Sequence, residues 1–212
     1  SQTCDSATEV TSSDTEWTTG WYVVQGTVEI GSRVTVSGDV HLILTDGCTL
    51  TVNGGIQVQD NDNNPDTPST NALTIYGQAN GTGKLTTRYV AINDAAIGGN
   101  GVLNEAGGSG GSGGAITING GIVEANSYYG AGIGGGSWTT KQDMDGINAA
   151  SDIVISGGRV SARGQYNCAG IGGGQYVPAR NITITGGHVS ATGHYGAAIG
   201  GGRWCHGKNI TI

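Results

Sequence analysis

A motif that recurs three times decides the fold: residues 116–136 read ITINGGIVEANSYYGAGIGGG, residues 153–174 read IVISGGRVSARGQYNCAGIGGG, and residues 182–202 read ITITGGHVSATGHYGAAIGGG. The chain ends on Ile210-Thr211-Ile212, which is the opening of a fourth copy. The copies therefore start at 116, 153, 182 and 210, and the steps between them are 37, 29 and 28 residues. A recurring period of this size is typical of a repeat architecture.

Each copy contains three short stretches that have the alternating pattern of a β-strand. The first stretch has apolar residues at alternate positions, the second follows a Gly-Gly pair, and the third runs through a Gly-Ile-Gly unit. The residues expected to face inward are Ile116, Ile118, Val123, Ala125 and Ile133 in one copy and their equivalents in the others. Three strands joined by glycine corners predict one coil of a parallel β-helix of about 28 residues, in which identical residues stack on successive coils.

The predicted β-helix extends toward the N-terminus in a less regular form. Residues 73–99 read as a degenerate copy, and residues 20–72 read as irregular coils in front of the GIGGG-type repeats of 73–212. We expect residues 20–212 to form a single all-β domain and the polar residues 1–19 to form an N-terminal cap that covers the open strand edges. The C-terminal end shows no cap, which predicts that the natural chain continues, that the segment is truncated, or that the end associates with another molecule.

Composition excludes several classes of protein. Gly provides 42 of 212 residues, which disfavours helices because glycine is a poor helix former. The glycines do not recur at every third position, so the chain is not collagen-like. No apolar stretch approaches the about 20 residues of a membrane-spanning helix. The net charge of −7 disfavours nucleic acid as a partner, because phosphates are bound by Lys and Arg.

The four cysteines, Cys4, Cys48, Cys168 and Cys205, are widely spaced and include no CxxC pair. An even number of such cysteines in an acidic chain favours an oxidising, extracytoplasmic location. We expect disulfides between Cys4 and Cys48 and between Cys168 and Cys205, because each pair lies within one or two coils. The alternative is that all four are buried thiols.

The sequence resembles a known group of proteins. The run GWYVVQGTVEIGSRVTVSGDVHLILTDGCTLTV, followed by LTIYGQ and the GAGIGGG and ITINGG units, is similar to β-helical repeat regions of secreted or wall-attached proteins of Gram-positive bacteria. It is also similar to carbohydrate-binding domain-containing, pectate-lyase-like β-helix proteins. The resemblance covers about residues 20–212. It implies a right-handed β-helix at the cell surface or in the extracellular medium and, in some members, binding of plant polysaccharide with calcium.

Two sets of aromatic residues fall at fixed positions in the repeats. Trp138, Tyr176 and Trp204 each follow the isoleucine of the third strand by five residues, and Tyr129, Tyr166 and Tyr195 precede it. Rings stacked coil on coil would form an outer stripe, and aromatic rings suit the apolar faces of sugars. The alternative is that the rings only cover the glycine corners of their own coils.

A cluster of oxygen ligands suggests calcium as a cofactor. Asp60, Asp62, Asn64 and Asp66 recur at alternate positions in one segment, and carboxylate and amide oxygens are the ligands that Ca²⁺ takes. The segment departs from an EF-hand loop at Pro65 and Asn71. A polar turn between two coils is the alternative reading.

These patterns favour a non-catalytic module that binds or adheres to a polysaccharide, of host or plant origin, through the aromatic stripe. The first alternative is a structural stalk or a self-assembling fibre segment, which the uncapped end suggests. A polysaccharide lyase or hydrolase ranks last. Asp143 and Asp145 follow Lys141 in one long insertion, but their separation is not fixed by the sequence, and the other charged residues do not converge on one register.

Overall fold

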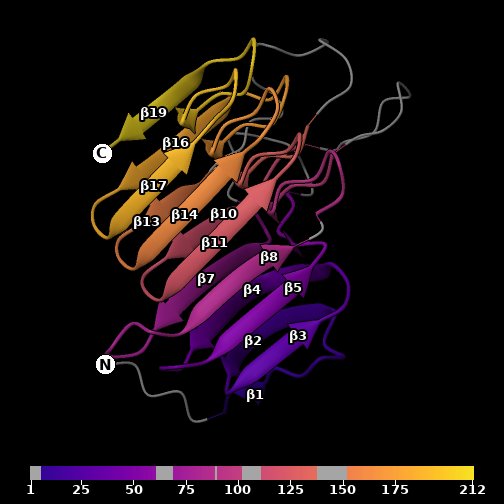
Figure 1. Ribbon diagram of the computed structural model, residues 1–212, viewed down its shortest axis with the longest axis vertical. Coiled ribbons are helices and arrows are strands. Elements are labelled where there is room, and N and C mark those ends of the chain that lie inside the picture. Colours follow the sequence, from indigo (N-terminus) through magenta and orange to yellow (C-terminus); the bar gives the residue numbers. More distant parts are fainter. Residues whose placement is uncertain (1–5, 61–68, 89, 102–110, 138–151) are drawn as a thin grey trace.

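The computed structural model describes residues 6–60, 69–88, 90–101, 111–137 and 152–212. Within these ranges all regular secondary structure is β-strand, and the strands stack from the indigo N-terminal coils to the yellow C-terminal coils along the longest axis of the molecule (Figure 1). Every pairing between named strands is parallel. The predicted parallel β-helix is therefore confirmed.

Each coil contributes one strand to each of three faces. The first face contains β7 (Ala72–Gly77), β10 (Ala115–Ile118), β13 (Ile153–Ile155), β16 (Ala179–Ile184) and β19 (Gly207–Thr211). The second contains β3 (Thr27–Ile30), β5 (Thr49–Asn53), β8 (Lys84–Arg88), β11 (Ile122–Ser127), β14 (Arg159–Gly164) and β17 (His188–Thr192). The third contains β6 (Ile56–Gln57), β9 (Ile97–Gly98), β12 (Ile133–Gly134), β15 (Ile171–Gly172) and β18 (Ile199–Gly200).

Two long N-terminal strands pass through a corner without a break. β4 (Val34–Leu44) pairs with β6 through its first residues and with β7 through Asp39–Leu44, so it joins the third face to the first. β2 (Glu16–Val24) pairs with β4 and is irregular between Thr18 and Gly20, and β1 (Thr8–Glu9) pairs with β2. The boundary predicted between residues 19 and 20 thus falls inside a strand, and Trp17 within that strand is fully buried.

The core consists of vertical ladders of like residues. Ile116, Ile153, Ile182 and Ile210 are register partners on the first face. Val123, Val160 and Val189 are partners on the second, and Ile133, Ile171 and Ile199 on the third. The ladders continue through Leu73, Leu85 and Ile97 into the N-terminal coils, so the degenerate copy lies in the same register as the regular repeats.

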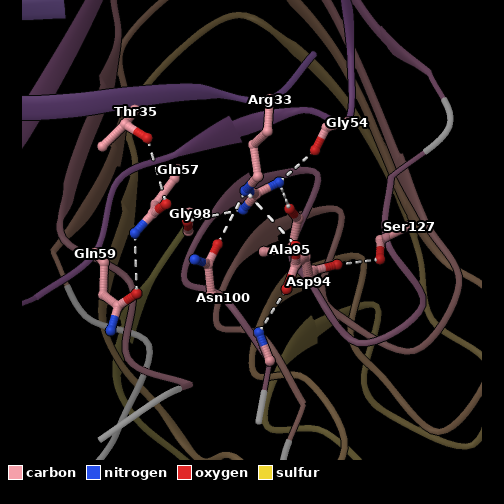
Figure 2. A network of polar contacts seen from close by, with 11 residues as sticks. Arg33, Thr35, Gly54, Gln57, Gln59, Asp94, Ala95, Gly98, Asn100 and Ser127 are labelled. Atoms are coloured by element: carbon pink, nitrogen blue, oxygen red, sulfur yellow. Dashed lines mark hydrogen bonds and ion pairs between the residues drawn. The ribbon is translucent and has the colours of Figure 1, made fainter. Parts of the chain in front are cut away.

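Arg33 links the turns of successive coils at one corner of the stack (Figure 2). Its guanidinium donates to the carbonyls of Gly54 (2.5 Å) and Ala95 (3.1 Å), and its Nε donates to Asn100 Oδ1 (2.9 Å). Asp94 Oδ2 lies 3.7 Å from Nε and provides the opposite charge. Burial lowers the pKa of Arg33, and the charge of Asp94 opposes that shift. The network satisfies carbonyls at a corner where strand pairing ends.

The Ile-Gly strands require glycine because successive coils approach each other closely at this corner. Gly134 has a φ of +130°, and a Cβ placed on it would overlap the carbonyl oxygen of Gly172 in the next coil. Gly98 has a φ of +137° and stands in the same relation to Gly134. A side chain at either position meets both an unfavourable backbone conformation and a backbone atom that cannot move aside.

We therefore expect Gly134→Ala to lower the free energy of unfolding by more than about 3 kcal/mol, because backbone strain and steric overlap add. Gly47 has a φ of +78° with open space around it, so Gly47→Ala isolates the strain and is expected to cost about 1–2 kcal/mol. Gly31 has neither feature, and Gly31→Ala is expected to change stability by less than about 0.5 kcal/mol. Urea denaturation of the three variants measures this order. Equal losses in Gly134→Ala and Gly47→Ala would contradict the close-approach explanation.

Candidate functional site

The predicted tyrosines lie together at the corner between the second and third faces. Tyr128 and Tyr129 follow β11, Tyr166 follows β14, and Tyr195 follows β17. The Tyr166 N–H donates to the Tyr128 carbonyl (2.7 Å), which places Tyr166 in the parallel register of Tyr129. The repeat thus brings residues of three successive coils to one corner of the stack.

The side chains at this corner form a continuous row of ring contacts. Ring centroids are 4.6 Å apart for Tyr128 and Tyr166, 5.5 Å for Tyr166 and His194, and 4.2 Å for His194 and Tyr195. Tyr129 joins the row 5.7 Å from Tyr166. The ring planes are tilted or edge-on to one another, so the rings form an uneven surface and not a flat platform.

Arg203 extends the row to Trp204. Its guanidinium carbon lies 5.3 Å from the Tyr195 ring centroid and 4.7 Å from that of Trp204, which is within the range of a cation–π contact. Arg203 also donates to Asn167 Oδ1 (3.1 Å), which fixes the guanidinium between the two rings. We call the set Tyr128, Tyr129, Tyr166, His194, Tyr195, Arg203 and Trp204 the aromatic ridge.

The ridge becomes more exposed toward the C-terminal coils. Tyr128 is 39% exposed, Tyr166 is 42% exposed, Trp204 is 55% exposed and Tyr195 is 72% exposed. A hydrogen bond with Tyr166, together with partial desolvation, raises the pKa of the Tyr128 phenol. The phenol therefore keeps its proton and remains a hydrogen-bond donor at neutral pH.

The second predicted set of aromatic residues is described only in part. Tyr176 and Trp204 occupy the same position of equivalent turns, which are closed by hydrogen bonds from Val177 N–H to the Gly174 carbonyl and from Cys205 N–H to the Gly202 carbonyl. Both residues have positive φ, 60° and 71°. Trp138 lies outside the described residues.

Sequence reasoning missed His194 and Arg203, which connect the ridge. The sequence does contain a signal for His194, because His194 precedes Tyr195 just as Tyr128 precedes Tyr129 in an earlier copy of the repeat. Arg203 has no comparable signal, because its equivalent in the preceding coil is Gln175. Its role depends on where the turn before Trp204 directs the side chain.

Charge is divided along the axis of the β-helix. All 16 Asp and Glu residues lie within residues 1–152, whereas five of the nine Lys and Arg residues lie within 153–212: Arg159, Arg163, Arg180, Arg203 and Lys208. The exposed end of the ridge therefore belongs to coils that carry only positive formal charge. The N-terminal coils carry the excess negative charge of the chain.

A separate aromatic cluster, which the sequence analysis did not single out, lies on the outer side of the first face. Trp21 of β2 is the register partner of His41 of β4, and their rings stack at 4.4 Å with an interplanar angle of 18°. Tyr76 of β7 lies 5.3 Å from Trp21. A cavity of about 340 Å³ opens beside these rings and is lined by Trp21, Ile43, Tyr76, Gly77 and Gln78. We call this hollow the Trp21 cavity.

Asp46 holds the loop that forms one wall of the Trp21 cavity. Its carboxylate accepts hydrogen bonds from the backbone N–H groups of Asn80 (3.0 Å) and Thr82 (3.1 Å). Its own backbone N–H donates to Gln78 Oε1 (3.0 Å). The hydrogen bond from the Asn80 N–H is the main reason that the pKa of Asp46 lies below its ordinary value of 3.8.

The predicted calcium site lies mostly outside the described residues. Asp60 is described and is 5% exposed, whereas Asp62, Asn64 and Asp66 are outside the described ranges. Among the described residues no three His, Cys, Asp or Glu side chains are grouped as metal ligands. Asp143 and Asp145 also lie outside the described part. Calcium stays a prediction.

The predicted disulfide between Cys168 and Cys205 is not formed in the structure, where Cys48, Cys168 and Cys205 are free thiols. Cys168 Sγ lies 3.6 Å from the carbonyl oxygen of Tyr128, so the thiol faces the preceding coil, whereas Cys205 belongs to the following one. Burial raises the pKa of the Cys168 thiol to about 12 and that of Cys205 to about 11, which keeps both protonated. Cys4 lies outside the described residues.

Comparison with known proteins identifies the repeat. A family model described as "Beta helix repeat" matches residues 116–137, 153–175 and 182–203, and each match spans one strand of each face. Searches of curated proteins and of solved structures each found no match. No described segment forms a helix with the length and apolar character needed to cross a membrane. The family match thus agrees with the observed fold.

The lowered pKa of Asp46 predicts how pH acts on the wall of the Trp21 cavity. Because the pKa is lower in the folded state, the stabilisation by Asp46 is complete above about pH 4 and is lost as the pH falls through the folded-state value. We expect the amide chemical shifts of Asn80 and Thr82 to change in that acidic range, measured by NMR titration.

Asp46→Asn should abolish this transition, because the variant has no carboxyl group to titrate at that position. Asp39→Asn is the matched control, since the Asp39 side chain is 61% exposed and lies next to His41 rather than next to Asn80 and Thr82. A transition that persists unchanged in Asp46→Asn would contradict the assignment of the titration to Asp46.

Proposed function

We propose that this protein is a non-catalytic carbohydrate-binding module, secreted or displayed at the cell surface, that contacts a polysaccharide along the aromatic ridge. The observation that supports this proposal is a continuous row of contacts, which runs ring to ring from Tyr128 to Tyr195 and then through the Arg203 guanidinium to Trp204, and which ends in its most exposed members. A row of this kind matches an extended ligand better than a compact one.

The chemistry of the ridge suits sugars. Aromatic rings offer their faces to the apolar C–H faces of pyranose rings, and Tyr combines such a face with a hydroxyl group. The tyrosine hydroxyl groups can donate and accept hydrogen bonds, and Arg203 carries N–H groups between two exposed rings. Successive coils are about 4.8 Å apart, so the contacts repeat along a chain and weak individual contacts add up.

The charge of the C-terminal coils favours an acidic polysaccharide. Residues 153–212 contain five Lys and Arg residues and no Asp or Glu. A carboxylate or sulfate group on the ligand is therefore not repelled by any negatively charged side chain of these coils. Arg203 lies within the ridge itself, where its guanidinium matches the geometry of a carboxylate. Binding that depends on such pairs should weaken as salt screens them.

The alternative that the rings only cover their own corner applies best to Tyr129. Its ring is half-buried and contacts both Tyr128 and Tyr166. It applies least to Tyr195 and Trp204, which are mostly exposed. The contribution to binding is therefore assigned chiefly to the C-terminal members of the ridge.

Trp204→Ala and Tyr195→Ala should each weaken binding to immobilised uronate-containing or sulfated polysaccharide by about tenfold, because each removes one stacking contact and part of its buried area. Arg203→Lys should cost less and should retain the salt dependence, since it keeps the charge and loses the planar group. Surface plasmon resonance at low and high salt measures both effects.

Thr185→Ala is the matched control, because Thr185 is exposed in the same coils and lies outside the ridge. Unchanged thermal midpoints would show that the variants are folded. The proposal would be wrong if the aromatic variants bound as tightly as the wild-type protein, or if none of the acidic polysaccharides bound at all.

A further inference from the structure

We propose that the Trp21 cavity is a second binding site, separate from the aromatic ridge, and that it takes an uncharged sugar ring. The cavity is formed by residues from three successive coils: Trp21 from β2, Ile43 from β4, and Tyr76, with Gly77 and Gln78, at the end of β7. Its volume of about 340 Å³ lies within the range of small-molecule sites, about 300–1,000 Å³. The inference rests on different residues from those of the ridge and does not depend on it.

The strand register explains why the rings converge here. Trp21 and His41 are partners in one outward row, and Val23, Ile43 and Tyr76 form the neighbouring outward row. The alternate positions, such as Leu42 and Ile75, are buried in the core. Two aromatic rings and one aliphatic side chain are thus presented on the outer surface of a rigid sheet, where burying them under a ligand is favourable.

The stacking of Trp21 on His41 orients the indole. The ring centroids are 4.4 Å apart and the planes are 18° apart, so His41 covers one face of the indole. This contact restricts the side-chain conformation of Trp21. Tyr76 lies 5.3 Å from Trp21 at an angle of 31°, which makes a shallow wedge rather than a closed cage. A wedge of two rings is suited to the flat C–H face of a pyranose.

Polar groups at the rim provide hydrogen bonds for hydroxyl groups. Burial and the charge of Asp39 raise the pKa of the Tyr76 phenol, so the hydroxyl group stays protonated and can donate or accept a hydrogen bond. Its oxygen lies 3.3 Å from His41 Nδ1. Gln78 Oε1 is occupied by the Asp46 N–H, which leaves the amide NH₂ group for a ligand oxygen. The lining contains no charged side chain.

Charge separates this ligand from that of the ridge. All Asp and Glu residues of the chain precede residue 153, and Asp39, whose carboxylate lies 3.4 Å from His41 Nε2, is largely exposed next to the cluster. An anionic sugar would be repelled by this carboxylate. A small organic cation is the competing occupant, because the same carboxylate would attract it, but cation sites enclose the charge within aromatic rings, and the Trp21 and Tyr76 rings form an open wedge.

The outward row also suggests that the ligand is part of a chain. His41, Thr74 and Thr117 are register partners on successive coils, so two hydroxyl groups follow the cavity along the β-helix axis. A neutral oligosaccharide anchored by one ring in the cavity can place its next units over these threonines. We therefore expect affinity to increase from monosaccharide to trisaccharide.

The experiment is an NMR titration of the full chain with neutral glucose, galactose, mannose and xylose sugars and with their oligosaccharides, at millimolar concentrations. The Trp21 indole N–H and the Gln78 side-chain amide should shift. Trp21→Ala should weaken binding by about tenfold, and Tyr76→Phe or Gln78→Ala should weaken it about threefold. Trp204→Ala should leave this binding unchanged.

Tyr76→Phe and Gln78→Ala remove single polar groups, so they test the site even if Trp21→Ala fails to fold. The proposal is overturned if no neutral sugar shifts these signals, or if tetramethylammonium shifts them and sugars do not. It is also overturned if Trp204→Ala abolishes the binding of neutral sugars, since the ridge would then be their site. Loss of acidic-polysaccharide binding in Trp204→Ala, with the Trp21 signals still responding to neutral sugars, separates the two proposals.

Discussion

The whole structure depends on parallel pairing of like residues between successive coils. A coil of three short strands has too little apolar surface to be stable alone, and it gains a core only when its inward residues meet those of its neighbours. Ile116 on Ile153 on Ile182, and Ile133 on Ile171 on Ile199, are that core. The Ile-Gly strands set the closest approach, because Gly134 and Gly172 leave no room for a side chain between coils.

The same constraint creates the outer surfaces. When inward residues are held in register, outward residues of successive coils become neighbours as well, and Tyr128, Tyr166, His194 and Tyr195 become a row of contacting rings. The ridge arises in this way from the turns after β11, β14 and β17. The Trp21 cavity arises from two outward rows of the N-terminal coils, although these coils lack the GIGGG repeat.

The two surfaces differ in charge because the chain segregates its ionisable residues along the stack. A β-helix translates position in the sequence directly into height along its axis, so among the described residues the Asp and Glu side chains lie in the coils up to Asp152, and the later coils carry only Arg and Lys. A globular fold with many long-range crossovers would mix these segments. The aromatic ridge therefore ends in coils with only positive formal charge, whereas the Trp21 cavity lies near the exposed carboxylate of Asp39, and this difference is the reason for proposing different sugars for the two surfaces.

The sequence by itself determined the fold, the ladder residues and the register of Tyr129, Tyr166 and Tyr195, because the same alternating pattern and the same Gly-Gly and GIGGG units return in each copy even where an insertion lengthens the step from 28 or 29 to 37 residues. Only the tertiary structure decided where side chains at irregular corners point. It placed Arg203 between Tyr195 and Trp204, directed the Cys168 thiol away from Cys205, and brought Trp21, His41 and Tyr76 together. Those contacts depend on turn geometry and on pairings between coils of unequal length, which no repeated pattern in the sequence encodes.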